Sequence, residues 1–399
     1  MSAALPLDAI RVVEFSHMAM GPTCGLVLAD LGADVVKVEP TAGDNTRRLP
    51  GSGAGFFVSF NRNKRSLALD IKSPRGLAFV RRLIGRADVL IENFRPGTMD
   101  ELGLGYAALK ESNPKLIYCS MKGFLSGPYE HRSALDEVVQ MMGGLAYMTG
   151  PRGRPLRAGA PVNDMMGGLF AVIGILAALQ QRAATGTGQC VKSALYENTA
   201  FLVSTSMAQF AVTGKAVPPM PERLSAWAVY DVFDTADDLQ IFVGVVTDTQ
   251  WRSFCEAFRQ AELAADPALA TNPQRVAARD RLIPRLRPLF KALTRAEAER
   301  VCEAARLAYA PIRRPDELFD DPHLNEPGGM VELSLPAGGT TRVPALPLEF
   351  DGRRLGARRD IPRAGEHSVA VARELGLDAT AIEDLVRAGV LGADAGGKA

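Results

Sequence analysis

Residues 163–179 constrain the fold more than any other stretch of the chain. Residues 165–179 are the longest apolar run and are rich in Gly and Ala. This run is shorter than the roughly 20 residues that are needed to cross a bilayer. We therefore expect a buried helix whose small residues allow close packing, and we expect no association with a membrane.

Asp164 stands at the expected start of this helix. The first turn of a helix presents unpaired N–H groups and the positive end of the helix dipole, so a carboxylate there stays ionised and is held in one orientation. That environment suits a nucleophile. Asp is also a preferred N-cap residue, so this stretch alone leaves a purely structural role open.

Length and composition limit the possible classes of protein. The chain has 399 residues, 47% apolar and 23% charged, which predicts a globular protein of two domains. A formal net charge of +1 favours neither nucleic acid nor an anionic membrane as a partner. The scattered cysteines and histidines predict no disulfide framework and no metal site. Free thiols and the lack of an apolar leader predict a cytoplasmic protein.

The first forty residues predict a β-α-β unit, with strands at 10–15 and 35–39 around a helix at 21–31. Gly21, Gly25 and Glu39 imitate a dinucleotide-binding fingerprint. The G-x-G-x-x-G pattern itself is missing, so an NAD-dependent oxidoreductase is only a weak alternative.

Strands and helices continue to alternate up to residue 195, which predicts an α/β fold with a parallel sheet covered on both faces. Further strands are expected at 67–72, 88–94, 116–121 and 189–195. Ligands of such sheets bind beyond the carboxyl ends of the strands, which directs attention to residues 92–95 and 120–123.

A Pro-rich stretch at 214–221 marks a domain boundary, and a second boundary is expected near 320–323. We therefore predict three parts: residues 1–215, a smaller α+β domain at 216–325, and a C-terminal part at 326–399.

Residues 61–66 hold three basic side chains just before a predicted strand. Such a cluster is either a solvated edge or a clamp for phosphate groups.

Several motifs, in this order and spacing, resemble the class III CoA-transferases of the formyl-CoA and crotonobetainyl-CoA transferase type. The resemblance covers essentially the whole chain and rests on Gly21-Pro22, residues 28–39, 43–47, 61–66 and 92–97, Gly123-Phe124, Gly127-Pro128, residues 185–189, 365–367 and Leu391.

The resemblance implies that Asp164 is the nucleophile of a CoA-transferase. The expected chemistry is attack on an acyl-CoA to give an aspartyl anhydride and then an aspartyl-CoA thioester, which passes CoA to a carboxylic acid. Gly167 and Gly168 are candidate oxyanion donors. Acyl-CoA and a carboxylic acid are then the substrates, and no tightly bound cofactor is expected.

CoA contacts are implied for two strand-end segments and one lysine: Leu69, Asp70, Ile71, Lys72, Asn93, Phe94, Arg95 and Lys122. Arg47 and Arg157 are candidates for holding a second carboxylate of a small dicarboxylic acid. They are equally well interpreted as surface arginines.

Similar proteins have a Rossmann-like large domain built from both chain ends and form interlinked dimers, so the resemblance implies a homodimer of that kind.

The α-methylacyl-CoA racemases share the fold and use a His/Asp pair, and Leu135 stands where they carry His. Ala19, Pro40 and Glu101 depart from the formyl-CoA transferase pattern, so the resemblance does not imply formyl-CoA or oxalate as substrates.

Overall fold

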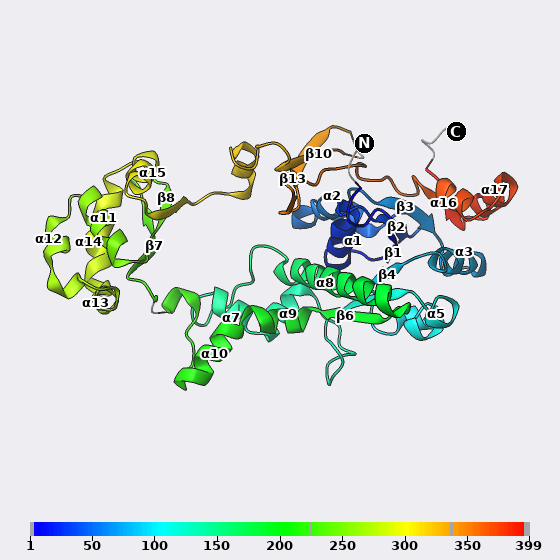
Figure 1. Ribbon diagram of the computed structural model, residues 1–399, viewed down its shortest axis with the longest axis horizontal. Helices are drawn as coiled ribbons and strands as arrows, with labels where there is room; N and C mark the ends of the chain where they lie inside the picture. The colour runs from blue at the N-terminus through cyan, green and yellow to red at the C-terminus, as the bar shows by residue number, and fades with distance from the viewer. Residues whose placement is uncertain (1–3, 224, 336–337, 395–399) are drawn as a thin grey trace. The chain divides into compact units, whose positions relative to one another are not determined.

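The structure is a computed structural model that describes residues 4–223, 225–335 and 338–394. Its contacts divide the chain into two compact units (Figure 1). The large unit comprises residues 1–221 and 322–399, and the small unit comprises residues 222–321. The boundaries expected from the sequence, 215/216 and 325/326, lie near these divisions.

A seven-stranded sheet forms the centre of the large unit, in the order β14-β3-β2-β1-β4-β5-β6. The strands run parallel except β14, which pairs antiparallel with β3. This is a Rossmann-like order, in which the strand sequence reverses between β1 and β4. The predicted α/β class with a parallel sheet is confirmed. The strands are β1 (Arg11–Phe15), β2 (Asp34–Glu39), β3 (Arg65–Leu69), β4 (Val89–Glu92), β5 (Ile117–Lys122), β6 (Cys190–Ala194) and β14 (Leu391–Gly392).

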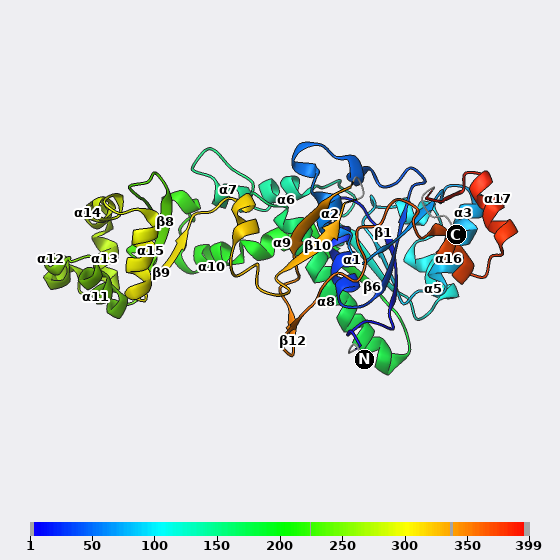
Figure 2. The same ribbon diagram turned by 90° about the horizontal axis from the view of Figure 1, so that it is seen from above.

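Helices cover both faces of this sheet (Figure 2). On one face, α1 (Met20–Asp30) and α8 (Val162–Thr185) pack against each other and against the strands. Because both faces are covered, the strands are buried on both sides, as is usual for parallel sheets. The opposite face is covered by α3 (Pro74–Ile84), α4 (Thr98–Glu101), α5 (Tyr106–Ser112), α16 (Ser368–Glu374) and α17 (Ala379–Arg387).

The other elements of the large unit lie in its connections. The helical segment after β6 is interrupted at Val203, so it forms two helices, α9 and α10. These connecting elements are η1 (Asn45–Arg48), η2 (Gly51–Gly53), α2 (Phe56–Phe60), α6 (Asp136–Met142), α7 (Leu145–Thr149), α9 (Leu195–Leu202), α10 (Ser204–Thr213), η3 (Met220–Glu222), β10 (Met330–Ser334), β11 (Thr340–Pro344), β12 (Glu349–Phe350) and β13 (Arg353–Arg354).

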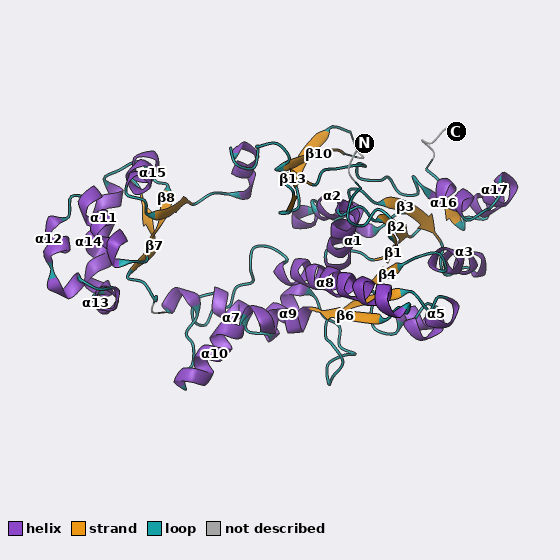
Figure 3. Ribbon diagram, in the orientation of Figure 1, coloured by secondary structure: helices purple, strands orange, loops and turns teal. Residues whose placement is uncertain are grey.

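The small unit combines an antiparallel sheet, in the order β7-β8-β9, with a group of helices (Figure 3). Phe233 stacks on Phe290 in its core, with ring centroids 4.3 Å apart. Its elements are β7 (Val229–Asp234), β8 (Gln240–Val245), α11 (Asp248–Ala257), α12 (Ala261–Ala265), η4 (Pro267–Leu269), α13 (Asn272–Ala277), α14 (Arg279–Lys291), α15 (Arg295–Ala304), β9 (Ala308–Pro311) and η5 (Pro315–Asp320).

The basic cluster before β3 is neither a solvated edge nor a phosphate clamp, so both interpretations were wrong. Arg62 is 2% exposed and donates from Nη2 to Asp30 Oδ2 over 2.7 Å. Lys64 is fully buried, and its Nζ lies 2.9 Å from Glu14 Oε2. Arg65 is paired with two further carboxylates. Arg62 and Lys64 thus neutralise the buried carboxylates of Asp30 on α1 and Glu14 on β1, and they hold these elements together.

We predict that Arg62→Ala destabilises the large unit strongly, because Asp30 would stay buried without its cation. Removing one partner of a buried ion pair costs about 3–5 kcal/mol of unfolding free energy, which urea denaturation at neutral pH can measure. Arg48→Ala is the control, since Arg48 is exposed and should change stability by less than about 0.5 kcal/mol. Equal stabilities of the two variants would contradict the structural role.

Candidate active site

Asp164 lies in the first turn of α8 and is half-buried. The N-cap position is occupied by Pro161, which makes no side-chain capping bond. Asp164 is therefore not the N-cap residue that the sequence left open as an alternative. Among the residues that the structure describes, none donates a hydrogen bond to its carboxylate.

The capping group at the start of α8 comes from α6. Oδ2 of Asp136 accepts the backbone N–H groups of Asn163 at 2.8 Å and of Asp164 at 3.0 Å. Its other oxygen accepts a hydrogen bond from Gln140 Nε2. The Gln140 carbonyl oxygen accepts the N–H of Ala158 at 2.8 Å. Two side chains of α6 thus fix the segment that leads into α8.

The surroundings of Asp164 change its acidity. Burial, followed by the neighbouring charges of Asp136 and Glu137, raises the pKa of Asp164 to about 7. The expectation that the helix dipole keeps this carboxylate fully ionised was therefore wrong, because desolvation and like charge outweigh the dipole at this site. Near neutral pH the group exists in both protonation states.

The glycines that follow Asp164 set the distance between α8 and α1. A Cβ at Gly167 would lie 2.5 Å from the side chain of Met20, and one at Gly168 would lie 2.7 Å from the Met20 carbonyl oxygen. Both glycines lie within the helix, where backbone N–H groups bond to carbonyls one turn earlier. This position explains the role of the two glycines in packing. Their N–H groups are bonded within the helix, so they are not free to bind an oxyanion.

The two candidate arginines for a substrate carboxylate are both occupied. Arg47 donates to Glu39 from Nε at 2.8 Å and from Nη2 at 2.7 Å, and its Nη1 bonds to the carbonyl of Pro362. Arg157 is half exposed and pairs with Glu137, whose charge acts on Asp164. Of the two, Arg157 is the more exposed, and its partner is one of the charges that act on Asp164.

The same contacts weaken the dinucleotide alternative. Glu39 stands where an acidic residue binds ribose hydroxyls in dinucleotide-binding folds. Here its carboxylate is buried, paired with Arg47, and accepts a 2.5 Å hydrogen bond from Ser66 Oγ. It is therefore not available to a ribose.

Most of the predicted CoA contacts converge on one apolar cavity of about 570 Å³ beyond the carboxyl ends of β1, β2, β3 and β4. We call it the strand-end pocket. It lies where the strand order reverses, the usual position of ligands in such sheets. Its lining includes six predicted residues and two that sequence reasoning missed: Leu69, Asp70, Ile71, Lys72, Phe94 and Arg95, with Phe15 and His17.

Asn93 supports the loop that carries His17, one of the residues that line this pocket. Its side chain accepts the backbone N–H of His17 at 3.1 Å and donates to the His17 carbonyl at 2.9 Å. The next residue, Met18, has a left-handed φ of 65°, a conformation uncommon for a side chain other than Gly. Asn93 therefore holds a constrained loop at this end of the sheet.

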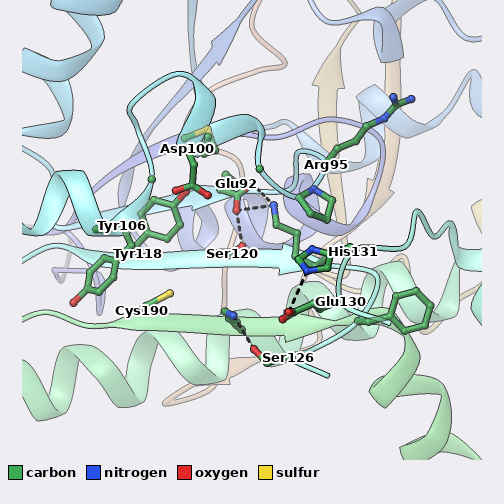
Figure 4. A pocket seen from close by; sticks show the side chains of 18 of the residues that line it. Glu92, Arg95, Asp100, Tyr106, Tyr118, Ser120, Ser126, Glu130, His131 and Cys190 are labelled. Atoms are coloured by element: carbon green, nitrogen blue, oxygen red, sulfur yellow. Dashed lines mark hydrogen bonds and ion pairs between the residues drawn. The ribbon is translucent and has the colours of Figure 1, made fainter. Parts of the chain in front are cut away.

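A second cavity, of about 490 Å³, lies beside β4, β5 and β6 (Figure 4). Lys122 is one of the residues that line it. Its Nζ lies 2.8 Å and 2.6 Å from the two oxygens of Glu92 and 2.6 Å from the carbonyl of Phe94. Glu92 also accepts from Ser120 Oγ and from the N–H of Phe94. All three ammonium hydrogens of Lys122 are thus used in positioning the loop at residues 93–95.

Sequence reasoning gave no role at the site to His17, Glu92 or Asp136. For His17, the available signal was its position just after the end of the first strand. Glu92 was placed at the correct edge of the sheet, but its partner on β5 could not be read from spacing. Asp136 lies at the start of α6, and nothing in the sequence indicated that it caps α8.

Among residues 4–223, 225–335 and 338–394, no cluster of His, Cys, Asp and Glu could hold a metal ion.

In the same described part, α8 is long and apolar enough to cross a membrane by length and composition. Six of its small or apolar residues are instead buried, and four of these belong to the core on this face of the sheet: Ala171, Val172, Ile175 and Ala178. This is the pattern of a core helix.

The fold and the site together define a Rossmann-like α/β protein with a carboxylate at the start of a core helix and a strand-end pocket. The model of CoA-transferase family III matches residues 7–368. The chain belongs to this family and is a CoA-transferase, which confirms the predicted resemblance.

Relatives that are similar over most of their length carry the same activity. A succinate–glutarate CoA-transferase of Agrobacterium fabrum is 34% identical over 93% of this chain and 96% of its own. A formyl-CoA:oxalate CoA-transferase of Rhodopseudomonas palustris is 31% identical over 92% and 93%. The crystal structure of a CAIB/BAIF family protein from Brucella suis, 34% identical, superposes with a TM-score of 0.83 over 94% of this chain and 100% of that one.

We predict that Lys122→Met raises the KM for acyl-CoA by about tenfold and changes kcat much less, because the loop at 93–95 loses its support in the ground state and the transition state alike. Steady-state kinetics would measure both constants. Lys192→Met is the matched control: Lys192 lines the same cavity but is exposed, and it donates a hydrogen bond to Ser126. A loss of kcat at constant KM would place Lys122 in the chemistry instead.

Proposed function

We propose that Asp164 is the covalent nucleophile with which this CoA-transferase moves CoA from an acyl-CoA to a carboxylic acid. The observation that carries the proposal is the position of Asp164 in a family III chain. It is half-buried at the capped start of α8, with a carboxylate that no described residue engages.

The first half-reaction forms and then uses an anhydride. A carboxylate oxygen of Asp164 attacks the thioester carbonyl carbon, the C–S bond breaks, and CoA leaves as a thiolate. The thiolate then attacks the aspartyl carbonyl carbon of the anhydride. This step releases the donor acid as a carboxylate and leaves an aspartyl-CoA thioester.

The second half-reaction reverses these steps with the acceptor. Its carboxylate attacks the aspartyl thioester, thiolate leaves, and a new anhydride forms. The thiolate attacks the acceptor's acyl carbon, so acceptor-CoA is released and the Asp164 carboxylate returns. No net proton is consumed. The energy of the thioester is conserved because the half-buried site limits hydrolysis of the acyl intermediates.

The strand-end pocket is the proposed binding site for CoA. Its apolar lining from Phe15, Leu69 and Ile71 suits the uncharged parts of the ligand. Lys72 and Arg95 supply cations at the same cavity for its phosphates. Asn93 and Lys122, which were predicted as contacts, contribute by holding the lining loops.

We propose small dicarboxylic acids as the acids exchanged, with succinyl-CoA as donor. Support comes from the names of the relatives, which include succinate, glutarate and oxalate. Arg157 is the proposed partner of the second carboxylate, in place of Glu137. The structure supplies no such support for Arg47.

We further propose that the enzyme acts in the cytoplasm without a bound cofactor, metal, nucleic acid or membrane.

Asp164→Ala should leave the fold intact, since the cap of α8 comes from Asp136, and should lower transfer by at least about a thousandfold. Wild-type enzyme given succinyl-CoA and then hydroxylamine should carry a hydroxamate on Asp164, because the amine attacks an aspartyl anhydride or thioester. Peptide mass spectrometry would locate the modification.

A hydroxamate on Asp136 or Glu137, or full transfer by the Ala variant, would refute this assignment. A parallel incubation tests the racemase alternative. One epimer of a 2-methylacyl-CoA in deuterated water should gain no α-deuterium, because Leu135 replaces the expected His and cannot accept a proton.

We also propose that the enzyme is a homodimer, interlinked as the family resemblance implies. An apolar surface on α8, α9 and α10 supports it, because exposed patches of this kind usually mark interfaces. The exposed fraction is 59% for Ile173, 63% for Phe201 and 53% for Phe210. Leu169 and Met207 extend the same group of exposed apolar residues.

Light scattering after gel filtration should give a mass twice the 42.7 kDa of one chain. Interlinked chains cannot separate without unfolding, so the dimer should persist on dilution to nanomolar concentration. A monomer that dissociates freely and retains transfer activity would contradict the proposal.

A further inference from the structure

We propose that Asp136 is a positioning residue of this site: it fixes the turn that carries Asp164 and holds a second negative charge beside it. The inference rests on the proposed role of Asp164 as nucleophile. It concerns a residue on a different helix, separated from Asp164 by the loop at residues 150–161 and by α7.

The geometry of the cap argues for positioning. Helix starts leave backbone N–H groups without partners, and Pro161 supplies no side-chain acceptor. One oxygen of Asp136 accepts hydrogen bonds from two of these N–H groups, and one of the two is the N–H of Asp164 itself. It is only 5% exposed, and Gln140 holds its second oxygen, so its position is fixed from both sides.

A second carboxylate beside the nucleophile also has a chemical consequence. The free Asp164 carboxylate is repelled by Asp136, and this repulsion disappears when Asp164 becomes an uncharged anhydride or thioester. The like charge thus destabilises the ground state relative to the acylated enzyme and makes Asp164 more basic. Both effects favour attack on a thioester.

Among the residues that the structure describes, the charges that act on Asp164 are those of Asp136 and Glu137. Glu137 of α6 acts in the same direction as Asp136, but it is half exposed and paired with Arg157 of the preceding loop. Next to the glycines of α8, α1 contributes the uncharged Met20 and Thr23, and α9 contributes the uncharged Asn198. Asp136 is therefore the buried charge available to tune Asp164.

The pH dependence of kcat/KM in the free enzyme tests the inference. Wild-type kcat/KM should rise with pH through a midpoint near 7, because only the carboxylate of Asp164 attacks. Asp136→Asn keeps an acceptor oxygen for the two N–H groups but loses the charge, so the midpoint should fall by about one pH unit. Glu137→Gln, the matched control, should move it less.

Asp136→Ala removes both the charge and the cap. Its kcat should fall by about ten- to a hundredfold with little change in the KM for acyl-CoA, since misplacement of a reacting group affects the chemical step. The Asn variant should recover most of this loss, because it restores the acceptor. An unchanged midpoint in Asp136→Asn, or an unchanged kcat in Asp136→Ala, would overturn the inference.

A direct titration separates this inference from the proposed function. Carbon-13 NMR of aspartate carboxyl groups, with the Asp164 signal assigned by Asp164→Asn, reports its protonation without turnover. If Asp136→Asn lowers that titration but hydroxylamine traps another residue, the nucleophile assignment fails and the positioning geometry stands. If the titration does not move, the inference about Asp136 fails regardless of where the hydroxamate forms.

Discussion

The close approach of α8 to α1 is the constraint on which the rest of the site depends. A Cβ at Gly168 would lie 2.7 Å from a backbone oxygen of α1, a contact that real side chains do not make. The small residues of α8 therefore bring its first turn down onto the sheet, where α6 can reach it. Asp136 of α6 caps this helix start, two turns or less from the glycines that contact α1.

The strands and helices with strong apolar periodicity were predictable from the sequence. Strands β1, β2 and β5 and helix α8 lie within a residue or two of their expected positions. The start of β3 was not predicted, because Arg65 and its basic neighbours have the composition of a solvated loop. Their burial depends on carboxylates such as Asp30, on an element distant in sequence. Likewise, the two residues of β14 are too few to carry a pattern.

At the site, sequence reasoning located the segments but not the roles of individual side chains. Residues 69–72 and 94–95 do share one cavity, because strand ends of a parallel sheet lie at one edge. We predicted ligand contacts for Asn93, Lys122 and Arg47, and the sequence did not reveal the hydrogen bonds that each also makes with protein groups. Such pairings depend on which strands are neighbours and on side-chain reach, and neither follows from spacing along the chain.

The discontinuity of the large unit has a consequence for synthesis of the chain. Strand β3 borders the sheet until β14, at residues 391–392, pairs with it. A ribosome produces the small unit, 222–321, well before that strand. The growing chain must therefore keep an unpaired parallel edge from associating with other chains until translation is nearly complete. Chaperone dependence during synthesis should thus concentrate on the first half of the large unit, although the finished sheet has that edge covered.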